Sequence, residues 1–127
     1  MIRILSSIAV LGLLVGIAWH AASAQDESES SAPQHTIQEV MKLAHKDGLL
    51  KKVLDGKGRH KDAMELIDLY ASLADNQPPK GDAESWKAKT DALIIAAARF
   101  SVRRKDGIAK LKVASNCKAC HSAHKGE

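Results

Sequence analysis

Apolar residues recur at helical spacing in four stretches of the chain, and polar segments separate these stretches. The four stretches are 37–54, 61–74, 83–102 and 107–123. Thr36 with Glu39 matches a capping box before the first stretch, and Asp82 and Asp106 are suitable N-caps before the third and the fourth. Gly48 is expected to weaken the first helix without ending it. The pattern therefore predicts an all-α fold, an up-down-up-down four-helix bundle with short connections.

The first 24 residues have the layout of a secretory signal peptide. Arg3 precedes an apolar run over 4–18, whose 15 residues are too few for a comfortable membrane span. Ala22-Ser23-Ala24 matches an A-x-A cleavage site, and an uncleaved N-terminal anchor is the alternative. We therefore expect an exported, periplasmic protein. The expected division is a signal peptide at 1–24, a flexible linker at 25–35 and one domain at 36–127.

Five residues near the C-terminus match C-x-x-C-H, the attachment signature of c-type haem: Cys117-Lys118-Ala119-Cys120-His121. On one helical turn, positions i, i+3 and i+4 share a face. Two thiols can therefore bond to the haem vinyl groups while the imidazole of His121 ligates the iron. Cys117 and Cys120 are the only cysteines, so none is left for a structural disulfide. Because c-type haem is attached outside the cytoplasm, the export signal and the motif support each other.

Three other interpretations of these residues are open. A thioredoxin-type dithiol would follow a strand, and no strand pattern precedes this one. A zinc site could use Cys117, Cys120, His121 and His124, although structural zinc sites usually draw their ligands from two separated pairs. A chance match at the end of an exposed helix is the third. We interpret the motif as a site for one covalent haem c per chain, with His121 as the proximal iron ligand.

A haem motif at the end of the last of four helices resembles the class II cytochromes c, the cytochrome c′ family with its low-spin relatives. Motif identity is confined to Cys117–His121, while the similarity in layout covers the whole mature domain. The family pattern commonly continues with an aromatic and then a basic residue; here His124 and Lys125 follow, and we expect His124 at the surface or at a frayed end. Low-spin members take a methionine of the first helix as second axial ligand. Met41 lies at the matching place, with His45 one turn later as its rival.

The resemblance implies periplasmic electron transfer for low-spin members, and binding of gases such as NO or CO for high-spin members. We therefore expect a small electron carrier with His/Met-ligated haem iron, and not an enzyme. A five-coordinate gas-binding protein is the alternative. A haem-free metal-binding or structural helical module is a further one.

Positive charge is concentrated at the C-terminal end. Without its signal the chain has 18 Lys and Arg against 15 Asp and Glu, and residues 103–127 alone hold seven against two. This region includes the haem motif, which predicts acidic redox partner proteins guided by Lys110, Lys112, Lys118 and Lys125. An ordinary solvated helix face is the alternative. With few aromatic residues and no recognised motif, no nucleic-acid partner is expected. For the mature form we expect no membrane partner, and a monomer or a homodimer.

Overall fold

The computed structural model describes residues 32–127, so the predicted signal peptide and most of the predicted linker lie outside the described residues. Within 32–127 the chain is helical and contains no strand. The helices are α1 (Ile37–Val40), the π-helix η1 (Met41–Lys46), α2 (Leu49–Leu54), α3 (His60–Asp75), α4 (Ala83–Ser101), α5 (Gly107–Ala114) and α6 (Cys117–His124). Among the described residues, no helix combines the length and the apolar character needed to cross a bilayer.

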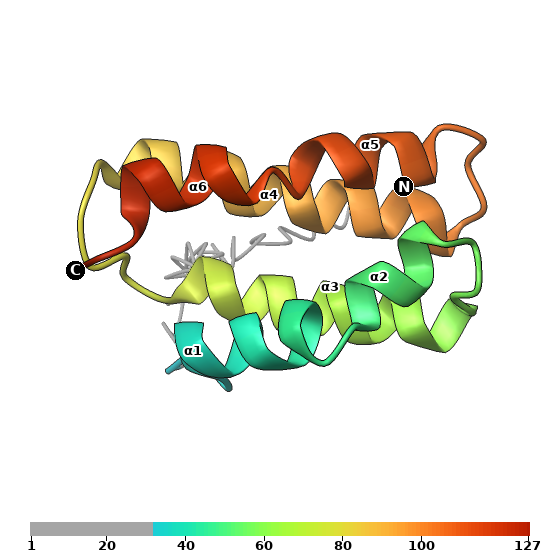
Figure 1. The fold of residues 1–127 in the computed structure, drawn as a ribbon, viewed down its shortest axis with the longest axis horizontal. Helices are drawn as coiled ribbons and strands as arrows, with labels where there is room; N and C mark the ends of the chain where they lie inside the picture. Colours follow the sequence, from blue (N-terminus) through green and yellow to red (C-terminus); the bar gives the residue numbers. More distant parts are fainter. Residues whose placement is uncertain (1–31) are drawn as a thin grey trace, which may run out of the picture.

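The helices form four segments that pack together, which confirms the all-helical prediction for the described residues. The first segment contains α1, η1 and α2, the second is α3, the third is α4, and the fourth contains α5 and α6. Successive segments run in opposite directions and are joined by short turns (Figure 1). The first two segments lie on one side of the molecule and the last two on the other, with the most extensive helix contact between α3 and α4.

The N-caps predicted at Thr36 and Asp82 are present, whereas Asp106 precedes α5 without a side-chain cap hydrogen bond, so that predicted cap is wrong. Thr36 Oγ1 accepts a hydrogen bond from the Glu39 N–H at 3.2 Å, and the Glu39 carboxylate accepts one from the Thr36 N–H at 2.7 Å. At the start of α4, the Asp82 carboxylate accepts a hydrogen bond from the Ser85 N–H at 2.7 Å. These side chains satisfy N–H groups that have no partner within their own helix.

The prediction of one continuous helix over 37–54 is wrong. The chain is wound as a π-helix over Met41–Lys46, and the N–H of Asp47 donates to the carbonyl of Lys42, five residues earlier, at 2.8 Å. Gly48 then adopts a left-handed backbone with φ of 87° and separates η1 from α2. Glycine adopts this conformation without the steric cost that a Cβ brings. Gly48 therefore divides the segment, where the sequence pattern led us to expect a weakened but continuous helix.

The core lies between the four segments and is built mainly from aliphatic side chains. Its largest fully buried apolar members are Tyr70, Leu66, Leu73 and Leu111. Trp86, from the first turns of α4, is also buried. Because α3 packs against the first segment and against α4, it contributes more of this core than any other helix.

A buried carboxylate joins α2 to the start of α3. Asp62 is 3% exposed; it accepts a hydrogen bond from Lys52 Nζ at 2.8 Å and another from the Arg59 N–H at 2.7 Å. The Lys52 hydrogen bond, with the Arg59 N–H as the second contributor, lowers the pKa of Asp62 below its usual range. The ionised form is therefore favoured in the folded protein.

We predict that Asp62→Ala lowers the urea concentration at the midpoint of unfolding near neutral pH, because both hydrogen bonds are lost. Since folding lowers the pKa of Asp62, this stabilisation is present above its ordinary value of 3.8 and is lost as the pH falls through the lower folded value. Urea titrations of both proteins at neutral and acidic pH measure the difference. Asp68→Ala, at an exposed position of the same helix, is the control and should unfold like the wild type. Equal midpoints for Asp62→Ala and wild type at neutral pH would contradict the prediction.

Candidate haem site

The C-x-x-C-H motif has a short helix of its own, so the prediction of one helix over 107–123 is wrong. α5 ends at Ala114, and Asn116 is the N-cap of α6. The Asn116 side chain accepts a hydrogen bond from the Ala119 N–H at 3.1 Å. Asparagine is among the favoured N-cap residues, which explains why the helix restarts here. Cys117 is consequently the first residue of α6, and Cys120 and His121 follow one turn later.

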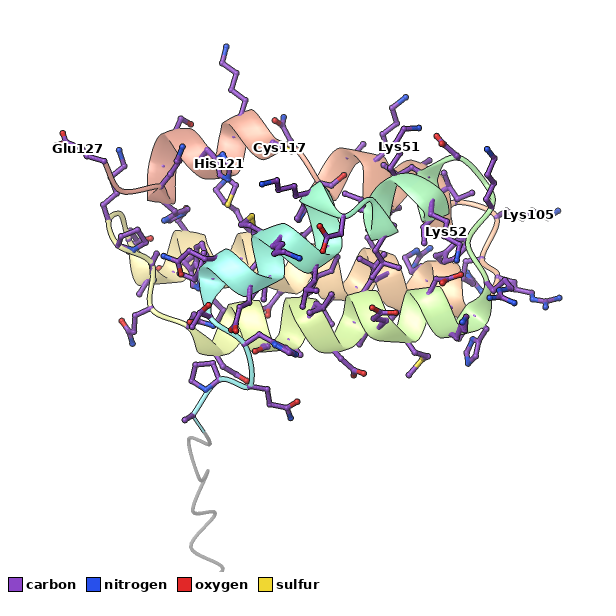
Figure 2. All side chains as sticks on the ribbon, turned by 60° about the horizontal axis from the view of Figure 1, so that its bottom comes forward. Lys51, Lys52, Lys105, Cys117, His121 and Glu127 are labelled. Carbon is purple, nitrogen blue, oxygen red and sulfur yellow. The ribbon has the colours of Figure 1, made fainter. Side chains whose placement is uncertain are left out.

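The three motif side chains line a cleft between α6 and the first segment. Cys117 and His121 are exposed, Cys120 is half-buried, and both cysteines are free thiols. The cleft has two adjoining chambers of about 770 and 370 Å³, and both have mainly apolar walls. Figure 2 shows Cys117 and His121 on α6, with the His121 side chain on the side of the first segment. Chambers of this size fall in the range of about 300–1,000 Å³ that is usual for small-molecule and cofactor sites.

Met41 and His45 lie on the opposite wall of this cleft. Met41 is half-buried and lines both chambers, as do Lys46, Cys120 and His121. His45 lines the smaller chamber. Both come from the π-helix η1, a type of helix that is frequent at functional sites. The structure therefore brings all five site residues predicted from the sequence around one cleft.

His45 is held as a neutral imidazole. Its ring is tilted against that of Tyr70, with 5.9 Å between the centroids. Burial lowers the pKa of His45 below its usual range, and the nearby His121 lowers it further. The Nε2 atom is buried and has no hydrogen-bond partner among the described residues. A neutral imidazole with an unengaged nitrogen is the form that binds metals.

Two more buried polar atoms at this end of the core have no hydrogen-bond partner among the described residues, Tyr70 OH and Trp86 Nε1. Burial raises the pKa of Tyr70 above its usual range, and the nearby Cys117 thiol adds to this shift. Trp86 lines the larger chamber. Buried polar atoms without partners are few in native proteins, and an absent bound group is one established reason for them.

These residues fit a covalently attached haem. The chain offers two thiols and an imidazole on one wall of a mainly apolar cleft, a thioether on the other wall, and unpartnered polar atoms close by. Cys117 and Cys120 would hold the group, while His121 and Met41 would supply the two axial donors. His45 is the alternative to Met41 as second donor.

His124 is buried, so the expectation of a surface residue or a frayed end is wrong. It is 2% exposed and is the one buried residue of α6. Its Nδ1 lies 3.2 Å from the Lys80 carbonyl oxygen and its Nε2 lies 3.1 Å from Ser85 Oγ. The ring meets Trp86 edge-on, with centroids 5.4 Å apart. An aromatic residue at this place in the family pattern was the one signal in the sequence that a ring is buried here.

Gly81 allows this close approach. Its φ is 89°, and a Cβ at this position would lie 2.6 Å from His124 Nδ1 and 2.5 Å from the Ala123 carbonyl oxygen. A side chain at residue 81 would therefore push α6 away from the turn that joins α3 to α4. Together, Gly81 and His124 fix the C-terminal end of α6 on the rest of the protein.

The contacts of His124 also weigh against the zinc alternative. Both of its ring nitrogens already have protein partners, so His124 does not complete a four-ligand set with the motif. Within residues 32–127, no group of three or more His, Cys, Asp or Glu side chains lies close enough together to hold a metal ion.

Comparison of the chain with protein-family models, with curated proteins and with solved structures finds no match in any of the three. The resemblance to class II cytochromes c therefore rests on Cys117–His121 and on the helical layout.

We predict that His124→Phe loosens α6 while the rest of the fold stays intact. A phenyl ring keeps the packing against Trp86 but loses both hydrogen bonds, so the α6 amides should exchange hydrogen roughly tenfold faster or more. Hydrogen exchange resolved by residue is the measurement, and the central amides of α4 serve as the internal reference. Ser122→Ala, at an exposed position of α6, is the matched control and should exchange like the wild type. Unchanged α6 exchange in His124→Phe would show that these contacts do not hold the helix.

Proposed function

We propose that the protein is a monohaem c-type cytochrome of the class II type, an up-down-up-down four-helix bundle that transfers electrons in the periplasm. One observation carries the proposal: Cys117, Cys120 and His121 share one wall of a cleft whose opposite wall presents Met41. Haem bound there supplies one-electron chemistry through its iron. This role needs no catalytic side chain, and we propose no enzymatic activity.

The two thiols differ in their surroundings. Cys117 is exposed, whereas Cys120 is half-buried and packs against the core. Burial raises the pKa of Cys120, an effect that the positive charge of Lys89 partly opposes. Cys120 therefore stays a protonated thiol near neutral pH and is less open to metal binding or oxidation than a thiolate would be. The pair is thus poorly suited to redox cycling, which weighs against the dithiol interpretation.

Met41 is the second axial donor in this proposal. A half-buried methionine on a helix is commonly core filler. Its place on both chambers, across the cleft from His121, supports the ligand role. A thioether is a soft, neutral donor, and His/Met ligation raises the reduction potential. His45 remains the alternative donor, because its imidazole is neutral and its Nε2 is unpartnered.

The smaller chamber favours a second candidate function, the binding of a gas such as NO or CO. Its wall includes the apolar side chains of Leu73, Leu93 and Ala114 beside Met41. If Met41 did not ligate, its side of the cleft would be free for a diatomic molecule once Cys117 and Cys120 held the haem. The two functions therefore differ in one property, the engagement of Met41.

We predict that haem attachment depends on each residue of the motif. His121→Ala should prevent normal haem maturation, and Cys117→Ala should leave at most one thioether bond. The measurement is the pyridine haemochrome spectrum of protein that is exported together with a cytochrome c maturation system. Lys118→Ala, inside the motif but exposed, is the control and should carry haem like the wild type. A full and spectrally unchanged haem content in His121→Ala would refute the ligand assignment, and a wild-type protein without haem would refute the proposed function.

We predict that Met41→Ala changes the coordination of the reduced protein from six to five ligands and allows rapid CO binding. His45→Ala should keep the wild-type spectrum. Optical and CO-titration spectra measure both, and Met64→Ala, at a 42% exposed methionine of α3, is the matched control. A wild-type protein that is already high-spin when oxidised, and that binds CO rapidly when reduced, would exclude Met41 as ligand and leave the gas-binding function in its place.

A further inference from the structure

Two turns distant in sequence meet at one end of the molecule. Residues 51–62 lead from α2 into α3, and residues 102–110 lead from α4 into α5. His60 Nδ1 lies 3.2 Å from the Ser101 carbonyl oxygen and links the two turns. We call these two ranges together the basic end.

The basic end carries the net positive charge of the described residues. It holds nine Lys and Arg against three Asp, a net charge of +6, while the remaining residues of 32–127 hold nine of each sign. Figure 2 shows Lys51, Lys52 and Lys105 at this end, with Cys117 and His121 farther along the molecule. Arg103, Arg104, Lys105 and Lys110 thus belong with a basic run of the first half of the chain, while the guidance of acidic partners by the lysines nearer the motif stays a prediction.

The three acidic residues of the basic end are already paired. Asp55 contacts Lys51, Asp62 contacts Lys52, and Asp106 contacts Arg99, with N–O distances between 2.5 and 2.8 Å. Six basic side chains are exposed and form no ion pair with any described residue: Lys57, Lys61, Arg103, Arg104, Lys105 and Lys110. Their charge is therefore available to an anionic partner.

Exposed aliphatic side chains lie beside these charges. Val102 is 68% exposed and Ile108 is 37% exposed, on either side of Arg103, Arg104 and Lys105. The basic end contains six Lys and three Arg, and no Phe, Tyr or Trp. Protein interfaces are usually enriched in aromatic residues and depleted in Lys. Clusters of four to eight Lys and Arg are typical of surfaces that bind anionic lipid headgroups, and exposed apolar side chains beside them can enter the headgroup region.

We propose that the basic end docks the protein on an anionic lipid surface, as a peripheral contact without a membrane-spanning segment. The lysines and arginines contact lipid phosphates and carboxylates, while Val102 and Ile108 enter the interface. Because Cys117 and His121 lie away from this end, docking leaves the cleft open to partners from solution. The proposal departs from the sequence analysis, which expected no membrane partner for the mature form, and it does not require haem.

Vesicle sedimentation of the whole chain without its predicted signal peptide tests the proposal. The probes are phosphatidylcholine vesicles with and without about one third phosphatidylglycerol, at low and high salt. Each basic side chain near an anionic surface strengthens binding by roughly fivefold. Replacing Arg103, Arg104 and Lys105 by glutamine should therefore weaken binding to the anionic vesicles by about a hundredfold. High salt should release the wild type, because exposed charges are screened over about 10 Å at 0.1 M salt.

The matched control replaces Lys80, Lys87 and Lys118 by glutamine, which removes the same charge from outside the basic end and should cost only a few-fold. Val102→Ser should weaken binding several-fold at constant charge. Equal losses in the two triple variants would overturn the proposal, because net charge alone would then explain binding. The proposal would also be overturned if the wild type failed to bind anionic vesicles or bound both vesicle types equally. Binding to soluble polyglutamate alone would overturn it as well, because it would indicate an acidic protein partner. Vesicle binding is measured with or without haem. A failure of the lipid proposal therefore leaves the cytochrome proposal standing, and a failure of the cytochrome proposal leaves the lipid proposal standing.

Discussion

The packing of α6 against the start of α4 is the contact on which the candidate site depends. α6 carries the whole C-x-x-C-H motif, yet His124 is its one buried residue. That imidazole reaches the Lys80 carbonyl and the Ser85 hydroxyl and rests on the edge of Trp86. Together with the packing of Cys120 on the core, these contacts set the position of the two thiols and His121 relative to Met41 across the cleft.

Interruptions of the helices shape both walls of the cleft. On one wall, η1 replaces a regular helix at the residues that face His121, and Gly48 ends it. On the other wall, the Asn116 side chain caps the N-terminus of α6. α6 therefore begins as a separate helix and need not share the axis of α5. By contrast, α3 and α4, which give the cleft apolar lining residues but no candidate ligand, are regular over their whole length. Irregular backbone is thus concentrated where we propose that a group binds, as is common at functional sites.

The sequence predicts the four helical segments and a set of candidate site residues that line one cleft, because periodicity, caps and the motif are patterns among neighbouring residues. The roles of those residues stay predictions. Periodicity placed the helical stretches, and the caps at Thr36 and Asp82 were visible in neighbouring residues. The motif and the resemblance together pointed to the residues that line the cleft. Two single residues were ambiguous in the sequence. Gly48 and Asn116 are tolerated inside a helix, but a glycine also often ends a helix and an asparagine often starts one.

Features made by residues far apart in the chain were not predictable in this way. His124 is buried by Lys80 and Ser85, about forty positions earlier, and no periodic pattern connects them. The basic end has the same origin, because each of its turns resembles an ordinary solvated loop until the fold brings the two together.

The position of the last core residue has a consequence for access to the two thiols. Leu111 is the final buried apolar residue of the chain, and the residues after it add only half-buried contacts and the His124 anchor. The aliphatic core therefore comes from the first three segments and α5, and α6 is held on it by His124 and by half-buried side chains such as Cys120. Under the cytochrome proposal, both thiols thus lie on the segment that adds least to the core, so exposing them to a maturation enzyme would cost the fold few buried contacts.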